Sequence, residues 1–323
     1  MLRTMSRRSV LQASIAGAAG ASASVLGINS LLVSRASAGL ARTPLQSMQL
    51  ADDLFLFQGA GGNVVAARSA DDLLLVDGGS AARSRELLKR IAAETGQRNV
   101  QVLVNTHWHW DHTGSNEALS RSGATILAHE NTKLWLTTEV ISKWENRTYP
   151  RLPARALPTQ TFFYDADARP LAFAGQTLEY GFMPQAHTDG DIYVFFPRQN
   201  VVVAGDVVSG GSYPIADYCT NGWLGGMITG LQTLLKKGDA QTRFIPGSGP
   251  LRSRADLEAQ IDMCFAVLSK IGESYYKGQT WDELVASRPT QDFDARWGNP
   301  ELFLRLAYAG AWNHINEIRR VTR

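Results

Sequence analysis

The chain is poor in cysteine, and this excludes one way of stabilising it. Its 323 residues include only two cysteines, Cys219 and Cys264, too few for a disulfide framework. One bridge between them could form in an oxidising compartment. However, Cys264 lies within the apolar helical run IDMCFAVL, so we expect it to pack as a small hydrophobic residue.

Acidic residues are absent from the first 38 positions. An arginine pair there is followed by a mildly apolar run from Val10 to Val33 and by Ala36-Ser37-Ala38, which has the small-x-small form of a signal-peptidase site. The stretch SRRSVLQ resembles a twin-arginine export signal. An ordinary secretory signal or a single anchor would be the alternatives, but the run is rich in Ala, Gly and Ser and suits a cleaved signal better than a stable span.

We therefore expect export through the twin-arginine machinery, cleavage after Ala38, a periplasmic location and no membrane attachment afterwards. The signal contains four basic residues, Arg3, Arg7, Arg8 and Arg35. Without them, the 32 basic residues fall to 28 against 30 acidic ones, and this slightly acidic balance gives no support for nucleic-acid binding. The remaining stretch of about 285 residues has no Pro/Gly-rich linker, so residues 39–323 are expected to form a single domain.

Strand-like and helical segments alternate along both halves of the chain, which predicts an α/β fold of sheets covered by helices. Strands are expected at 54–58, 63–69, 71–79, 100–106, 124–130, 171–182, 191–196, 201–205 and 243–246. Helices are expected at 81–95, from 131 to about Trp144, and at 224–237, 253–272, 280–287 and 300–320. Residues 146–170 are expected to be irregular.

The stretch NTHWHWDHTG, residues 105–114, holds three of the six histidines of the chain. It leaves a buried-type strand, and alternate side chains of a strand point to the same side. His107, His109 and Asp111 can therefore converge, the two intervening tryptophans should point away into packing, and His112 follows in the turn. Three imidazoles and a carboxylate suit zinc, and iron is also compatible.

Further donors follow two later strands. The stretch MPQAHTDGD places His187 between two strands, and VVVAGDVV ends a buried strand at Asp206. In this order after H-x-H-x-D-H, the two residues resemble those of the metallo-β-lactamase superfamily. The resemblance spans about residues 47 to 255 and includes DGG at 77–79 and IPGSGP at 245–250. It implies an αββα sandwich with the metal site at one edge of two facing sheets, here with extra C-terminal helices.

The resemblance also implies how the donors divide between two metal ions. The implied ligands are His107, His109 and His187 for the first ion, Asp111 and His112 for the second, and Asp206 as the bridge. Metal-bound hydroxide would be the nucleophile, since metal coordination lowers the pKa of water toward neutrality. Asp77 or Thr106 could accept the other N–H of a ligating imidazole.

One position departs from the family pattern. Where the family usually has PGHG, this chain has PGSG with Ser248 in place of the histidine. A serine hydroxyl is a poor zinc ligand beside imidazole and carboxylate, so we expect weaker binding of the second ion or one ion only. Asp111 could then act as a general base.

These features favour an exported metallo-hydrolase acting on a small molecule with an activated carbonyl: a lactam, lactone, ester or thioester. Asp206 and the long helical C-terminal part are similar to the glyoxalase II side of the superfamily. One alternative is an oxidoreductase like the persulfide dioxygenases of this fold, with one iron at His107, His187 and Asp206. Another is a metal-binding member whose catalysis is weakened by Ser248.

Two segments could supply contacts to a substrate. The candidate side chains are Tyr213, Tyr218 and Trp223 in the glycine-rich 205–226 stretch, and Trp144 and Tyr149 in 138–165. The same segments could equally be a capped loop leading into a helix and a solvated connection. His129 is expected to be a hydrogen-bonded residue beside the site or at the surface, and the alternative is that it substitutes for the missing ligand. His314 is expected to be structural, and Cys219 lies too far after Asp206 to be read as a ligand.

Overall fold

The computed structural model of the protein describes residues 44–163 and 168–315, and Leu45–Arg323 form one compact unit. The expected export signal, residues 1–38, lies outside the described residues. Within the described ranges, no helix is long and apolar enough to cross a membrane.

Seven strands form the first sheet. In spatial order they are β1 (Gln46–Ala51), β2 (Leu54–Ala60), β3 (Gly62–Arg68), β4 (Leu73–Val76), β5 (Val100–Val104), β6 (Thr125–His129) and β9 (Gln160–Phe162). β1 to β4 pair in antiparallel fashion, whereas β4, β5, β6 and β9 run parallel. The carboxyl ends of β4 and β5 therefore lie at one edge, and the DGG stretch and the histidine-rich loop follow them directly.

Five strands form the second sheet. They are β10 (Arg169–Phe173), β11 (Gln176–Met183), β12 (Asp191–Phe196), β13 (Val201–Gly205) and β14 (Arg243–Pro246). All neighbours are antiparallel except β13 and β14. This parallel pair needs a crossover, which contains α5 (Leu224–Leu234).

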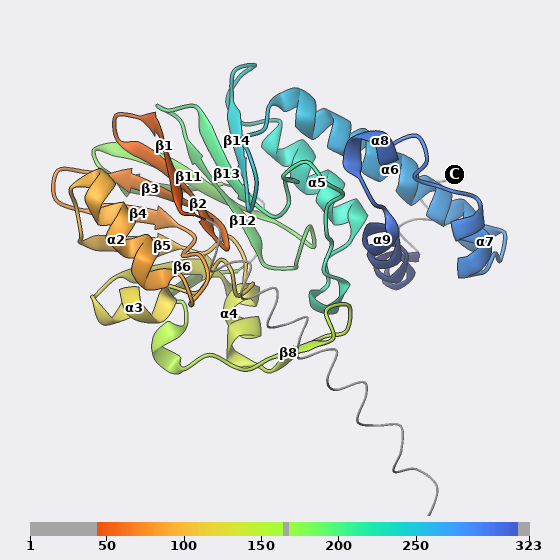
Figure 1. The fold of residues 1–323 in the computed structure, drawn as a ribbon, viewed down its shortest axis with the longest axis horizontal. Helices are drawn as coiled ribbons and strands as arrows, with labels where there is room; N and C mark the ends of the chain where they lie inside the picture. Colours follow the sequence, from red (N-terminus) through yellow and green to blue (C-terminus); the bar gives the residue numbers. More distant parts are fainter. Residues whose placement is uncertain (1–43, 164–167, 316–323) are drawn as a thin grey trace, which may run out of the picture. The chain divides into compact units, whose positions relative to one another are not determined.

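The two sheets face each other and carry helices on their outer faces, as Figure 1 shows. On β13, Val201 and Val203 belong to the core between the sheets, while Val202 and Ala204 pack in the cluster formed with the outer helices. This period of two is what a strand buried on both faces requires. The other helices are α2 (Ser84–Thr95), α3 (Asn116–Arg121), α4 (Glu130–Thr137), α6 (Arg254–Tyr276), α7 (Trp281–Ala286), α8 (Asp294–Trp297) and α9 (Glu301–Asn313).

α2 and α3 contribute to the core on the outer face of the first sheet, and α5, α6 and α9 to that of the second. The predicted αββα architecture with extra C-terminal helices is thus confirmed. Cys264 is fully buried in this helical layer, and both cysteines are free.

One predicted helix is wrong in length. α4 ends at Thr137 instead of continuing to about Trp144, and the chain then forms a hairpin of β7 (Val140–Ser142) and β8 (Arg147–Tyr149). The β-branched side chains of Val140 and Ile141 favour strand over helix. The stretch expected to be irregular therefore contains β8, the short edge strand β9 and a 3₁₀ turn at Ala154–Ala156.

His129 joins β6 to α4. Its Nδ1 accepts a hydrogen bond from the Asn131 N–H at 3.2 Å and caps the helix. The ring is buried and stacks on Phe182 with centroids 3.9 Å apart. Burial disfavours the charged imidazolium and lowers the pKa of His129 to about 4.

This shift predicts a pH-dependent stability. Because the folded pKa of His129 lies below the unfolded value of 6.5, its contribution is complete above pH 6.5 and is lost as pH falls through about 4. His129→Asn keeps a capping acceptor but does not titrate. Urea titrations should show that the wild type loses more unfolding free energy than His129→Asn when the pH is lowered from 7 to 4.5. A difference between the two proteins that stays constant with pH would contradict the assignment.

Candidate metal centre

Four donor groups converge at the edge where the two sheets meet. His107 and His109 follow β5, His187 lies between β11 and β12, and Asp206 follows β13. One donor atom from each lies within 4.8 Å of all the others. The first sheet thus supplies two donors, and the second sheet supplies the other two.

The histidine loop is fixed by its backbone. The N–H groups of His112 and Thr113 donate to the His109 carbonyl, so the chain turns immediately after His109. Gly62 N–H bonds to the Asp111 carbonyl at 3.1 Å, and Gly78 N–H to the His112 carbonyl at 2.6 Å. The strand pair β2–β3 and the turn after β4 therefore hold this loop from the same side.

Each of the three histidines turns one ring nitrogen toward the centre and uses the other elsewhere. His187 Nδ1 donates to the Ile215 carbonyl at 2.7 Å, and His109 Nε2 bonds to Asp217 Oδ2 at 3.2 Å. His107 Nδ1 lies 3.0 Å from Thr106 Oγ1. The inward atoms are therefore Nε2 of His107, Nδ1 of His109 and Nε2 of His187, each available as a lone-pair donor.

These atoms fit a divalent metal ion. His109 Nδ1 and His187 Nε2 face each other at 3.0 Å, and Asp206 Oδ2 lies 3.6 Å from Nε2 of both His107 and His187. The buried His107 Nε2 has no hydrogen-bond partner, although an unpaired buried polar atom is costly. Three imidazoles and one carboxylate form a donor set that zinc and iron both accept.

Burial and the neighbouring histidines together lower the pKa of His107 well below its usual value. The ring is therefore neutral near pH 7, which is the form that binds a metal.

His112 forms the second half of the cluster. Its Nδ1 lies 2.8 Å from Asp77 Oδ2, while its buried Nε2 lies 3.7 Å from Asp206 Oδ2 and has no hydrogen-bond partner. Asp77 also accepts bonds from the Thr106 N–H and hydroxyl, both at 2.8 Å. Asp77 thus orients His112 directly and His107 through Thr106, so both residues expected to support the ligands do so.

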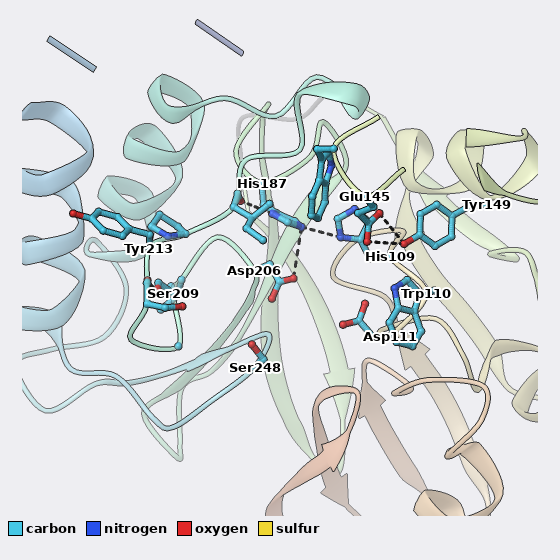
Figure 2. Close-up of a pocket in the computed structure, with 16 residues that line it drawn as sticks. His109, Trp110, Asp111, Glu145, Tyr149, His187, Asp206, Ser209, Tyr213 and Ser248 are labelled. Atoms are coloured by element: carbon cyan, nitrogen blue, oxygen red, sulfur yellow. Dashed lines mark hydrogen bonds and ion pairs between the residues drawn. The ribbon is translucent and has the colours of Figure 1, made fainter. Parts of the chain in front are cut away.

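Asp111 and Ser248 line the same cavity but are not among the four converging groups. In Figure 2 the Asp111 carboxylate faces the space beside Asp206, and Ser248 lies below them. Next to it, Gly247 is required by space, because a Cβ there would lie 2.0 Å from Asp206 Oδ1. The backbone after β14 therefore passes directly against the carboxylate of Asp206, which lies 3.6–3.7 Å from His107, His112 and His187.

The cavity has a volume of about 300 Å³. Trp144 and Tyr149 line it, as one of the two sequence interpretations expected. Trp110 also lines it, so the prediction that this residue points away is wrong. β5 ends at Val104, so the strand alternation on which that prediction rested stops before the histidine loop, where the chain turns at the His109 carbonyl; Trp108 is buried, as expected.

One part of the glycine-rich stretch 205–226 lines the cavity, and another part leads into a helix, so both roles expected for it are present. Its first part, Val208 to Ile215, lines the cavity, whereas Trp223 precedes α5 and stacks on His314 with centroids 4.2 Å apart. Tyr213 touches the cavity, but its hydroxyl turns to Asp294 Oδ1 at 2.8 Å.

Sequence reasoning missed Asp217. Its Oδ2 accepts bonds from His109 at 3.2 Å and from the Thr220 hydroxyl at 2.8 Å, and its Oδ1 accepts from Trp144 Nε1 at 2.9 Å. Burial opposes its ionisation, but these bonds outweigh burial and lower the pKa of Asp217 to about 2. In the sequence, Asp217 shows only the signal of a cap for the short turn Tyr218–Thr220, which it also is.

Residues 58–262 match the family model described as the metallo-beta-lactamase superfamily. Among curated proteins, the chain is 26% identical over 182 residues to 2,4-dinitroanisole O-demethylase subunit alpha of Nocardioides sp. (strain JS1661). That match covers 56% of this chain and 50% of the relative, so the chain spans about half the length of the curated protein that it matches.

Solved structures of similar fold include a metallo-beta-lactamase from Pontibacter korlensis, with 21% identity and a TM-score of 0.54. The DIM-1 metallo-beta-lactamase matches with 19% identity and the same TM-score. Each comparison covers 69% of this chain and 99% of the other. At these identities the likeness concerns the fold alone.

The serine at position 248 leads to a prediction of how many metal ions each chain binds. We expect purified protein, dialysed after loading with zinc, to retain one tightly held ion per chain, because the second group of donors has Ser248 where a further imidazole would complete it. Ser248→His should raise this toward two ions, and Ser248→Ala should leave it at one. Elemental analysis by mass spectrometry measures the ratio, and two tightly held ions in the wild-type protein would contradict the expectation.

Proposed function

The chain belongs to the metallo-beta-lactamase superfamily, and from this premise we propose that it is a metal-dependent hydrolase of substrates with an activated carbonyl. The substrate classes are lactams, lactones, esters and thioesters. The observation that carries the proposal is the convergence of His107, His109, His187 and Asp206 beside a cavity that Asp111 also lines. Zinc is the proposed metal, and iron suits the same donors.

When bound, a divalent ion would acidify a water molecule and polarise the carbonyl under attack. The protein's own groups orient the metal ligands and transfer the proton. Asp217 and the Ile215 carbonyl hold His109 and His187 in the tautomers that present lone pairs to the centre. Asp111 lines the same cavity, and its proposed role is to take the proton of the attacking water and return it to the leaving group.

A second candidate rests on the pair of 3.6 Å distances from Asp206 to His107 and His187. Two histidines and one carboxylate are the ligand set of mononuclear iron oxygenases, which supports the alternative of a persulfide dioxygenase. The third imidazole, His109, only 3.0 Å from His187, favours zinc and hydrolysis instead. Iron content together with oxygen uptake on a persulfide distinguishes the two, and a member whose catalysis has weakened would show neither activity.

We also propose that the protein is exported to the periplasm by the twin-arginine machinery. Replacing Arg7 and Arg8 together by lysine should retain the full-length chain in the cytoplasm, because the pair is the recognition element of this signal. Cell fractionation followed by immunoblotting measures the distribution. Arg35→Lys is the matched control and should be exported normally. Normal export of the paired variant would exclude this route.

The hydrolase proposal predicts turnover of at least one carbonyl substrate. The panel contains nitrocefin, aryl esters, lactones and thioesters. 2,4-Dinitroanisole, an aryl methyl ether without a carbonyl group, is assayed separately because the curated relative is named for its O-demethylation. Chelation should abolish the activity and added zinc should restore it. Asp111→Asn should reduce kcat by about 100-fold or more while one metal ion is retained, as expected for loss of a general base.

Two variants complete this experiment. Asp206→Asn should lose both metal and activity, because it removes a donor from the converging group. Ser248→Ala should keep both. If metal-loaded protein turns over none of the panel, the hydrolase proposal fails.

A further inference from the structure

The described cavity lining carries acidic side chains that no lysine or arginine balances. Three carboxylate side chains line the cavity, Asp111, Glu145 and Asp206, and none of the described lining residues is a lysine or an arginine. One divalent metal ion would balance two of these carboxylates and leave the third uncompensated. A substrate with an anionic group would therefore meet repulsion without a side-chain cation to receive it.

Arg147 and Arg252 contact residues that line the cavity but are engaged in other interactions. Arg147 lies with its guanidinium carbon 5.2 Å from the ring centre of Trp110 and 4.5 Å from that of Tyr149. It stacks on these rings, and it is not among the lining residues. On the opposite side, Arg252 donates to the carbonyls of Ser209 and Gly210 and supports that loop.

Three aromatic side chains, Trp110, Trp144 and Tyr149, line the cavity, and together they are called its aromatic wall. Figure 2 shows Tyr149 and Trp110 on the same side of the cavity. Trp144 Nε1 donates to Asp217 at 2.9 Å, and the Tyr149 hydroxyl donates to Glu145 at 2.8 Å. Side chains held in this way present flat apolar surface to a ligand at little entropic cost.

We propose, on the basis of the proposed hydrolase function, that the substrates are uncharged esters with a single aromatic ring, and that carboxylate-bearing analogues are selected against. A cavity of about 300 Å³ lies at the low end of ligand sites and suits a compact ring. The ring packs on the aromatic wall while the ester carbonyl faces the metal centre.

The chemical step is a balanced hydrolysis that needs no co-reactant. The oxygen of water bonds to the carbonyl carbon, and the bond between this carbon and the aryloxy oxygen breaks. The products are a carboxylic acid and a phenol, and the phenol leaves with the proton that Asp111 transfers.

A matched pair of esters tests the charge selection: phenyl acetate and 4-acetoxybenzoate, which differ by one carboxylate remote from the ester. Each kcat/KM is divided by the rate constant for hydroxide hydrolysis of the same ester, which removes intrinsic reactivity. We expect the normalised value for metal-loaded protein to be about tenfold lower for the anionic ester. Raising salt from about 0.01 M to about 1 M should narrow the gap, because the Debye length falls from about 30 Å to about 3 Å.

Glu145→Gln removes one wall charge but keeps an acceptor for Tyr149, so it should also narrow the gap. Glu139→Gln, at an exposed position outside the cavity lining, is the matched control and should leave the gap unchanged. Equal normalised rates for the two esters in wild-type protein would overturn the charge selection while leaving the hydrolase function intact.

The aromatic wall is tested with Trp144→Leu. We expect KM for phenyl acetate to rise about two- to tenfold and KM for ethyl acetate to rise less, with the metal content retained. Trp312→Leu is the control, since Trp312 is exposed on α9. Turnover of a lactone or thioester without turnover of phenyl acetate would overturn this substrate class alone. Failure of every carbonyl substrate would overturn the proposed function with it.

Discussion

The carboxylate of Asp77 is the contact on which the arrangement of the metal centre depends. It accepts bonds from the backbone and hydroxyl of Thr106 and lies 2.8 Å from His112, so a single side chain at the end of β4 fixes the start and the end of the histidine loop. The Asp77 N–H in turn bonds to the carbonyl of Val104, the last residue of β5. The parallel pairing of β4 and β5 is thereby extended into the site, and the imidazoles keep the orientation that metal binding needs.

Asp217 links the cavity lining to the metal centre, just as Asp77 links the histidine loop to β4. It bonds to His109 with one oxygen and to Trp144 with the other, so the position of the aromatic wall is tied to the position of a ligand. Thr220, which also donates to Asp217, accepts a bond from Trp108 behind the wall. The surface that would receive a ring and the centre that would act on its ester therefore share one buried anion, and neither can shift far without the other.

Sequence patterns were sufficient where a local rule governs the structure. The buried strands β5, β11 and β13 end at the same edge, and they bring His107, His109, His187 and Asp206 together there, as the sequence predicted. The patterns failed where tertiary contacts take over. The turn held by the His109 carbonyl reverses the direction of Trp110, and hairpin pairing ends α4 early. Asp217 carries only a capping signal in the sequence, because its bond to His109 spans 108 residues and leaves no local trace.

The division of the four donors between two sheets has a thermodynamic consequence. A metal ion held by His107 and His109 on one side and by His187 and Asp206 on the other is a crosslink between the two halves of the sandwich, and the unfolded chain has no equivalent site. By linkage, free metal at 1,000 times its dissociation constant would add about 4 kcal/mol to the free energy of unfolding. A bound ion would thus contribute to the tertiary structure as well as to the proposed chemistry, and the stability of the fold would depend on metal supply.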